Sequence, residues 1–238
     1  MKTQWLDDPV AMRLAGPDLL SLALMDSRNA LLQRLALDES APALRLAAHA
    51  GWHQEYWIAR HVQRQRGEAC DASAPRLSGA EPRVDRWLLQ GDDAAALDAT
   101  ALRAYLSETL EITLELLAGT PAADAPLHYF RQSLLHEDRL AEALAERLRA
   151  GAPPSRGECQ PIWLPAQRWP LGTAPGTGGL VPHNERWAHE VAVPEFEIDA
   201  QAVNWARFVE FAQDGGYDSF ELWTPAGWAW VQAQGRRA

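Results

Sequence analysis

The sequence predicts an α+β protein with two domains, a helical one over residues 1–150 and an irregular, mixed one over residues 163–238. Apolar residues recur at helical spacing through most of the first part, and this period is lost after Trp163. Seven of the 11 tryptophans follow residue 160, which indicates a loop-rich core held together by large aromatic rings. Residues 151–162 begin with Gly-Ala-Pro-Pro and are expected to form the linker.

Four long helices are expected in the first domain. The first starts at Pro17, because proline is favoured in the first turn of a helix, and the second stops at Gly67. Residues 68–99 are rich in Pro, Gly, Ser and Asp and predict a long connection with one short helix near 84–89. Two helix pairs joined by a longer crossover predict a four-helix bundle, a fold whose core can assemble a metal site. The four helices are placed at residues 17–37, 43–66, 100–118 and 125–150.

The composition excludes several classes of partner. A net charge of -10 argues against nucleic acid and anionic membranes, which both require a basic surface. No apolar run approaches the ~18 residues that cross a bilayer, and the N-terminus has no signal-peptide pattern. Two isolated cysteines, Cys70 and Cys159, indicate neither a disulfide framework nor a zinc cluster. A cytoplasmic protein is therefore expected.

Residues 136–142, His-Glu-Asp-Arg-Leu-Ala-Glu, look like a metal-binding helix that lacks one ligand. Two histidines four residues apart share one helix face and can hold one metal ion between them. Here Leu140 occupies the position of the second histidine. His49 and His53, in the expected second helix, do have this spacing. The alternative interpretation is that His49 and His136 are ordinary histidines of a core or groove.

Residues 46–55 and 134–142 resemble the DinB-like bundle of ergothioneine-type sulfoxide synthases, and are most similar to the selenoneine synthase branch. The resemblance implies a non-haem Fe(II) held by one histidine of the second helix and two of the fourth. His49 and His136 match the first two ligands, and Leu140 stands in the third position. Glu142 matches an acidic position that orients the site rather than binding the metal.

Three interpretations of Leu140 remain open at this point. The site is free of metal, or it is a two-histidine site completed by a carboxylate or water, or His53 supplies the missing nitrogen. Asp138 lies on the wrong side of the helix to complete the site, which weakens the second interpretation. The metal ligands predicted on the third interpretation are His49, His136 and His53.

The second domain is expected to contain short strands and turns over residues 164–191, a half-buried strand over 193–199 and a helix over 201–211. The order of its motifs, from Gly172-Thr173 to the tryptophan-rich segment 223–230, resembles the formylglycine-generating-enzyme-like domain, a mixed α/β fold of the C-type-lectin-like kind. The resemblance covers only the N-terminal part of that fold. It implies that this chain is a fragment or a shortened homologue, which would expose apolar surface.

Together the two resemblances imply an oxidoreductase with Fe(II) as cofactor, which uses O2 to join a thiol or selenol to the imidazole of a trimethylated histidine. Its partners would be these small molecules alone, while its catalytic residues and oligomeric state are not indicated. Trp52 and Tyr56 are expected to face the quaternary ammonium of the substrate through cation–π contacts. Ordinary packing is the alternative role for these rings.

Two other functions fit the same sequence. A non-catalytic or metal-free shortened homologue would act as a binding or scaffold protein, and Leu140 favours it. A metal-dependent thiol transferase of the DinB type would need three ligands within residues 1–150, and only the use of His53 provides them.

Overall fold

The computed structural model describes residues 8–71, 73–148 and 160–235. The chain divides into two compact units, one built from residues 1–152 with 172–188 and the other from 153–171 with 189–238. Helices and small antiparallel sheets are both present, which confirms the α+β class. The predicted last residues of the fourth helix, most of the predicted linker and Cys159 lie outside the described residues.

The first unit contains the predicted long helices. Pro17 stands at the start of the first of them, and the Asp98 side chain caps another by accepting a hydrogen bond from the Ala101 amide. The short helix expected near residues 84–89 is present as well. The helices of this unit are α1 (Pro9–Arg13), α2 (Pro17–Leu35), α3 (Ala41–Gln54), η1 (Glu55–Ala59), η2 (Arg64–Ala69), α4 (Pro82–Leu89), η3 (Asp93–Ala95), α5 (Ala99–Ala118), α6 (Asp124–Arg147) and η4 (His183–Glu185).

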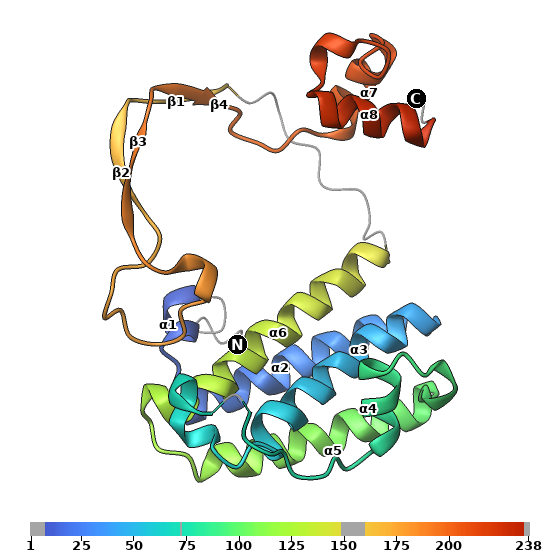
Figure 1. The fold of residues 1–238 in the computed structure, drawn as a ribbon, viewed down its shortest axis with the longest axis vertical. Coiled ribbons are helices and arrows are strands. Elements are labelled where there is room, and N and C mark those ends of the chain that lie inside the picture. Colours follow the sequence, from blue (N-terminus) through green and yellow to red (C-terminus); the bar gives the residue numbers. More distant parts are fainter. Residues whose placement is uncertain (1–7, 72, 149–159, 236–238) are drawn as a thin grey trace. The chain divides into compact units, whose positions relative to one another are not determined.

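The four long helices α2, α3, α5 and α6 lie side by side as a bundle (Figure 1). Helix α6 packs against both α2 and α3, and α5 contacts the same two helices. Two clusters of buried apolar side chains fill the bundle. One contains the second half of α2 with α3, α4 and the end of α6, and the other contains the first halves of α2 and α6. That the bundle is of the DinB type stays a prediction.

A buried polar layer crosses the middle of the bundle, and each long helix contributes one side chain to it. Arg28 of α2 donates to Glu137 of α6, with 3.0 Å between Nη2 and Oε2, and also bonds the Leu106 carbonyl. Gln54 of α3 donates to the same carboxylate at 2.8 Å, and Thr113 of α5 donates to Gln54 at 3.4 Å. Because buried polar groups are costly unless they are paired, this layer fixes the register of the four helices.

The second long helix ends earlier than predicted. Regular α-helix stops at Gln54, continues as the π-helical turn η1 to Ala59, and does not reach residue 66. Beyond it the backbone pairs with a distant segment, since His61 bridges to Arg76 and the Leu77 amide donates to the Arg60 carbonyl. Single π-helical turns inside helices are frequent at functional sites.

Residues 172–188 pack on the bundle although they follow the predicted linker. The Gly179 amide donates to Asp124 Oδ2 at 3.1 Å, and the Leu180 amide donates to the Arg13 carbonyl at 3.3 Å. Gly179 has a φ of +83°, and a Cβ there would collide with the Arg13 carbonyl. Asp124, in the first turn of α6, also bonds Arg131 at 2.7 Å. These contacts place the segment 180–185 beside α6.

Among the described residues, the second unit contains two small antiparallel sheets and three helices, the shortest of which is the 3-10 turn η5 (Phe220–Leu222). Strand β1 (Ile162–Leu164) pairs with β4 (Phe196–Ile198), and β2 (Gln167–Leu171) pairs with β3 (His189–Val193). Helix α7 (Trp205–Gln213) forms near its predicted place, where the Asn204 side chain caps it. Thr224 caps helix α8 (Pro225–Gln234), which covers a segment for which no helix was predicted.

Many large apolar side chains of the second unit are exposed. Trp205 exposes 76% of its surface and Trp163 57%, and Ile162, Trp169 and Leu222 are exposed too. Soluble proteins seldom leave so many such groups in contact with water. That this unit is part of a formylglycine-generating-enzyme-like domain stays a prediction. Among the helices that the structure describes, none has the length and apolar character required to span a membrane.

Candidate functional site

Three histidines gather where α3 faces α6. His53, at the end of α3, stacks on His136 of α6, with 4.3 Å between ring centroids and 24° between ring planes. His49 lies one turn before His53, close enough to His136 for its charge to act on that ring. The structure thus brings His53 and His136 into contact, with His49 one turn away on α3, and the use of the three as metal ligands stays a prediction.

His53 is the most enclosed of the three, with 8% of its surface exposed. Its Nδ1 lies 2.9 Å from the Ser133 hydroxyl, one turn before His136 on α6. A hydrogen bond at one ring nitrogen fixes the orientation of the imidazole and leaves the other nitrogen for a further partner. Ser133 was not foreseen from the sequence, although its position three residues before His136 places it on the same helix face.

All three rings are held in the neutral form. Burial lowers the pKa of His53 to about 3, with a further contribution from His136. Burial also lowers the pKa values of His136 and His49, with smaller effects of His49 on His136 and of Arg45 on His49. Neutral imidazole is the form that binds metal ions.

The free energy of unfolding is expected to fall by about 1.4 kcal/mol for each pH unit below 6.5 through His53 alone. The reason is that the unfolded chain binds a proton near pH 6.5, whereas folded His53 stays neutral down to about pH 3. Stability from this residue is therefore complete above pH 6.5 and is lost as the pH falls. Urea unfolding of the wild type and of His53→Gln between pH 7.5 and 4.5 tests this; equal pH slopes would contradict it.

The position of Leu140 agrees with its apolar character. It lies one turn after His136, is half-buried and packs against the core cluster that contains Ala141 and Leu144. Glu142 is exposed. Asp138 points away from the histidines and accepts a hydrogen bond from Ser27 at 2.6 Å, as expected for the opposite side of α6. No carboxylate of α6 therefore completes the histidine set.

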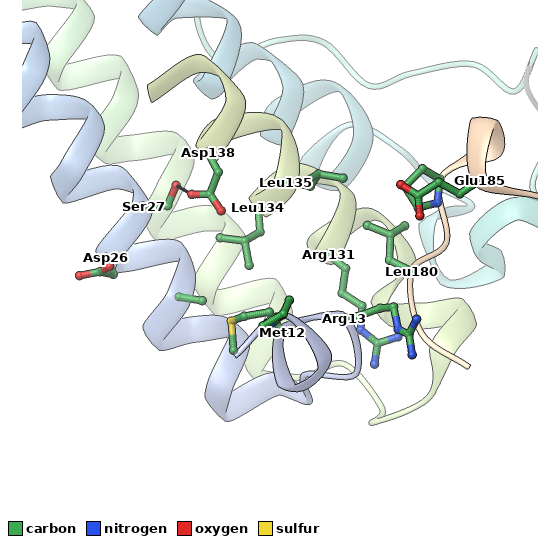
Figure 2. Close-up of a pocket in the computed structure, with 13 residues that line it drawn as sticks. Met12, Arg13, Asp26, Ser27, Arg131, Leu134, Leu135, Asp138, Leu180 and Glu185 are labelled. Atoms are coloured by element: carbon green, nitrogen blue, oxygen red, sulfur yellow. Dashed lines mark hydrogen bonds between the residues drawn. The ribbon is translucent and has the colours of Figure 1, made fainter. Parts of the chain in front are cut away.

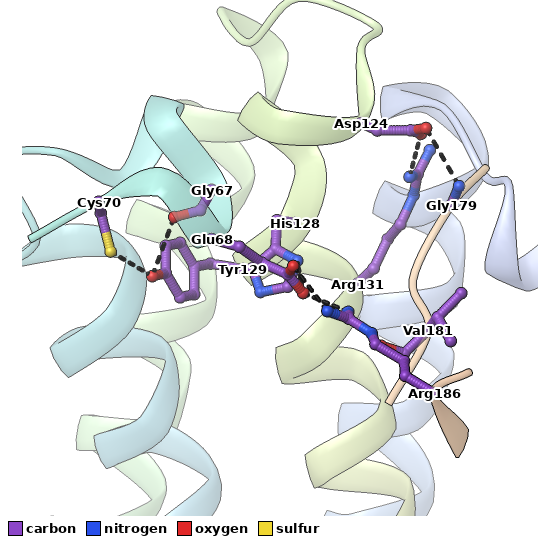
Figure 3. Close-up of polar contacts among 10 residues, drawn as sticks. All are labelled: Gly67, Glu68, Cys70, Asp124, His128, Tyr129, Arg131, Gly179, Val181 and Arg186. Atoms are coloured by element: carbon purple, nitrogen blue, oxygen red, sulfur yellow. Dashed lines mark hydrogen bonds and ion pairs between the residues drawn. The ribbon is translucent and has the colours of Figure 1, made fainter. Parts of the chain in front are cut away.

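His53 and His136 line a cavity of about 260 Å³ whose opposite wall is formed by residues 180–184. His128 and His183 also line it, together with Glu68. Figure 3 shows how this wall is held: Arg186 forms a two-point ion pair with Glu68, with 2.8 Å from Nη1 to Oε2, and also bonds the Val181 carbonyl. The cavity therefore combines several imidazoles with one carboxylate, an arrangement that the linear sequence does not reveal.

Trp52 and Tyr56 do not line this cavity. The Trp52 indole donates to Asp85 at 2.8 Å, and its ring stacks on Tyr56 with 4.9 Å between centroids. The guanidinium of Arg76 lies 4.8 Å from the centre of the Tyr56 ring, and that of Arg60 lies 5.5 Å away. Two guanidinium groups of the protein thus already contact the Tyr56 ring, and binding of a substrate ammonium by Trp52 and Tyr56 stays a prediction.

The ring orientations do not form a metal centre. In the part of the chain that the structure describes, no three His, Cys, Asp or Glu side chains are arranged to hold one ion. Stacked rings direct their nitrogens alongside each other rather than toward a common point, so at least one ring would have to turn. The donor chemistry still fits a divalent metal, since three neutral imidazoles lie together and Ser133 orients one of them.

No protein-family model matches the chain. The chain is similar to the hercynine oxygenase of Mycolicibacterium smegmatis, with 33% identity over 237 residues that cover 90% of this chain and 52% of that protein. It is 27% identical over 236 residues to the hercynine oxygenase of Mycolicibacterium thermoresistibile, covering 89% of this chain and 52% of the relative. The hercynine oxygenase of Mycobacterium tuberculosis is 24% identical over 253 residues, which cover 94% of this chain and 57% of that protein.

The chain thus spans about half the length of the curated relatives it matches. The similarity runs through both predicted domains, since it covers nine-tenths of the sequence. It supports the sulfoxide synthase resemblance drawn from the motifs, while the selenoneine branch stays a prediction. Over about nine-tenths of its length, the chain is similar to hercynine oxygenases.

Proposed function

We propose that this chain takes part in an ergothioneine-type reaction on hercynine, the trimethylated histidine for which its homologues are named. The observation that carries the proposal is the group of three neutral imidazoles, His49, His53 and His136, in a chain similar to hercynine oxygenases. The reaction class is an O2-dependent oxidation that joins a thiol or selenol to the imidazole of the substrate. The protein would act as a soluble oxidoreductase of the cytoplasm.

Fe(II) is the proposed cofactor, with His49, His53 and His136 as its ligands. Bound there, it would supply the activation of O2. The protein residues have separate tasks. Ser133 holds the His53 ring through Nδ1, burial keeps the imidazoles unprotonated, and Leu140 excludes water on the side of the core. The Glu68–Arg186 ion pair holds the opposite wall of the cavity beside these histidines.

A second candidate function is that of a metal-free homologue which binds small molecules without catalysis. Two features favour it. His53 stacks on His136, so the ring nitrogens do not point toward a common position, and Leu140 provides no ligand atom. The same cavity would then hold an imidazole-containing ligand directly. Metal binding separates the two candidates.

Anaerobic calorimetric titration with Fe(II) tests the proposal. We expect the purified chain to bind one equivalent, His136→Ala to abolish binding, and His53→Ala to weaken it by on the order of tenfold or more, because an ion held by two protein ligands is poorly retained. His128→Ala is the matched control: His128 lines the same cavity but lies about two turns before His136 on α6 and is not a proposed ligand, so the affinity should not change.

Each outcome decides one point. If the wild type binds no iron, the metal-free function replaces the proposed one. If His53→Ala binds iron as tightly as the wild type, His53 is not the third ligand, and the two-histidine site is completed by another group. Iron binding without O2 consumption in the presence of hercynine and a thiol would favour the thiol transferase over the synthase.

A further inference from the structure

A second and larger cavity lies on the other side of the segment 180–185. It has a volume of about 480 Å³ and is bounded by α1, α2, α6 and this segment (Figure 2). None of the three proposed metal ligands lines it. Leu135, Leu180 and Pro182 line both cavities and thus separate them. A cavity of this size, with apolar walls and a few polar groups, has the dimensions of a small-molecule site.

Carboxylates lie at one end of the cavity. Asp138 of α6 accepts a hydrogen bond from Ser27 of α2 at 2.6 Å (Figure 2), and Asp26 of α2 also lines the cavity. A cationic group of a ligand at this end would be attracted by both carboxylates.

Guanidinium groups lie at the other end, toward α1 (Figure 2). Arg131 is fully engaged there, with bonds to the Leu14 and Ala15 carbonyls and an ion pair with Asp124 at 2.7 Å. Arg13 is different: its Nε is buried and has no hydrogen-bond partner among the described residues. Buried donors in native proteins are almost always paired, so an unpaired one indicates a missing acceptor.

The wall between the two ends is apolar. Met12, Leu134 and Leu180 lie between Asp138 and Arg13, and Pro9 and Pro182 also line the cavity. A ligand that satisfies the whole cavity therefore has a cationic end, an apolar middle and an anionic end. Glu185 lines the cavity as well, so the negative groups outnumber Arg13 and the cationic end of the ligand should contribute more to binding.

We propose that this cavity is a binding site for an elongated small zwitterion, with its ammonium group at Asp138 and Asp26, its carboxylate at Arg13 and its apolar chain against Leu134. The site is separate from the histidine cavity, and its existence does not depend on iron. Leu135, Leu180 and Pro182 line both cavities, so a ligand in either cavity would contact this shared wall.

Calorimetric titration with three matched compounds tests the proposal: 6-aminohexanoate, which carries both charges, hexylamine, which carries only the cation, and hexanoate, which carries only the anion. We expect 6-aminohexanoate to bind on the order of tenfold tighter than hexylamine, and hexanoate to bind most weakly. Arg13→Gln should remove the advantage of 6-aminohexanoate over hexylamine. Asp138→Asn should remove its advantage over hexanoate.

Two control variants use residues of the same helices outside the cavity. Asn29→Ala on α2 and Glu146→Gln on α6 should leave all three affinities unchanged, and circular dichroism checks that every variant is folded. Equal affinities for the three compounds, no binding of 6-aminohexanoate, or an effect of the controls as large as that of Arg13→Gln would overturn the proposal. Because no metal is added, failure here leaves the iron titration unaffected.

Discussion

Replacing Glu137 by alanine will lower the free energy of unfolding by about 3–5 kcal/mol, the range found when one partner of a buried ion pair is removed. The Glu137 side chain is fully buried and that of Arg28 is 2% exposed. Without the carboxylate, the guanidinium of Arg28 stays in the core with only the Leu106 carbonyl as a partner, and Gln54 loses its acceptor. Urea unfolding at pH 7.5 measures the loss.

The pair Arg168–Glu190 is the control, because its side chains are 72% and 64% exposed. Glu190→Ala should cost less than about 1 kcal/mol, the usual range for an ion pair at the surface. Glu137→Gln, which keeps the shape and one acceptor, should cost less than Glu137→Ala. A loss under about 1 kcal/mol for Glu137→Ala would show that the polar layer does not hold the four helices in register.

Glu137→Ala should also disturb the positions of the histidines in the cavity. Glu137 follows His136, and its partner Gln54 follows His53, so the layer fixes the turns of α6 and α3 that present both rings. We expect the fold of the site to depend more on this layer than on any contact between the histidines themselves, because the ring contact is short-ranged and easily rearranged.

The helices of the bundle could be predicted because the residues that start, cap and pattern each helix lie within that helix or next to it. Proline at the start of α2, the capping Asp98 and apolar residues at helical spacing are all visible in the sequence. The π-helical turn at Glu55–Ala59 and the bridge between His61 and Arg76 that follows it were not visible in the helical spacing of the sequence. Arg28, a charged residue on the leucine-rich helix α2, is visible in the sequence and indicates a buried ion pair.

The candidate site shows the same division. The spacing of His49 and His53 and the position of His136 predicted a site shared by the three; the structure stacks His53 on His136, and the shared metal site stays a prediction. Three features of the site depend on tertiary contacts, so no sequence pattern predicted them. They are the stacking of the rings, the bond between His53 and Ser133, and the wall formed by residues 180–184. Tyr56 fitted a cation–π role in sequence, but only the fold shows that Arg76 lies over its ring.

Replacing Leu140 by histidine should raise the affinity for Fe(II) by on the order of tenfold or more. The new ring would project from the same face of α6 as His136, one turn away, which is the arrangement of two histidines that share one ion. Leu140 is only half-buried, so the exchange should lower the free energy of unfolding by about 1–2 kcal/mol, within the range of ordinary substitutions. Calorimetric titration under argon and urea unfolding measure the two effects.

Leu140→Gln is the matched control, since it introduces a polar side chain of similar size without an imidazole nitrogen. If it raises the affinity as much as Leu140→His, the gain comes from added polarity and not from a restored ligand. The sharper experiment combines Leu140→His with His53→Ala. If His53 serves as the third ligand in this chain, Leu140→His will restore the iron affinity that His53→Ala lowers, because each of the two side chains would provide one ligand nitrogen, from α6 and α3 respectively. Without that rescue, His53 belongs to the wall of the cavity, and the Ser133 bond serves to hold the wall in place.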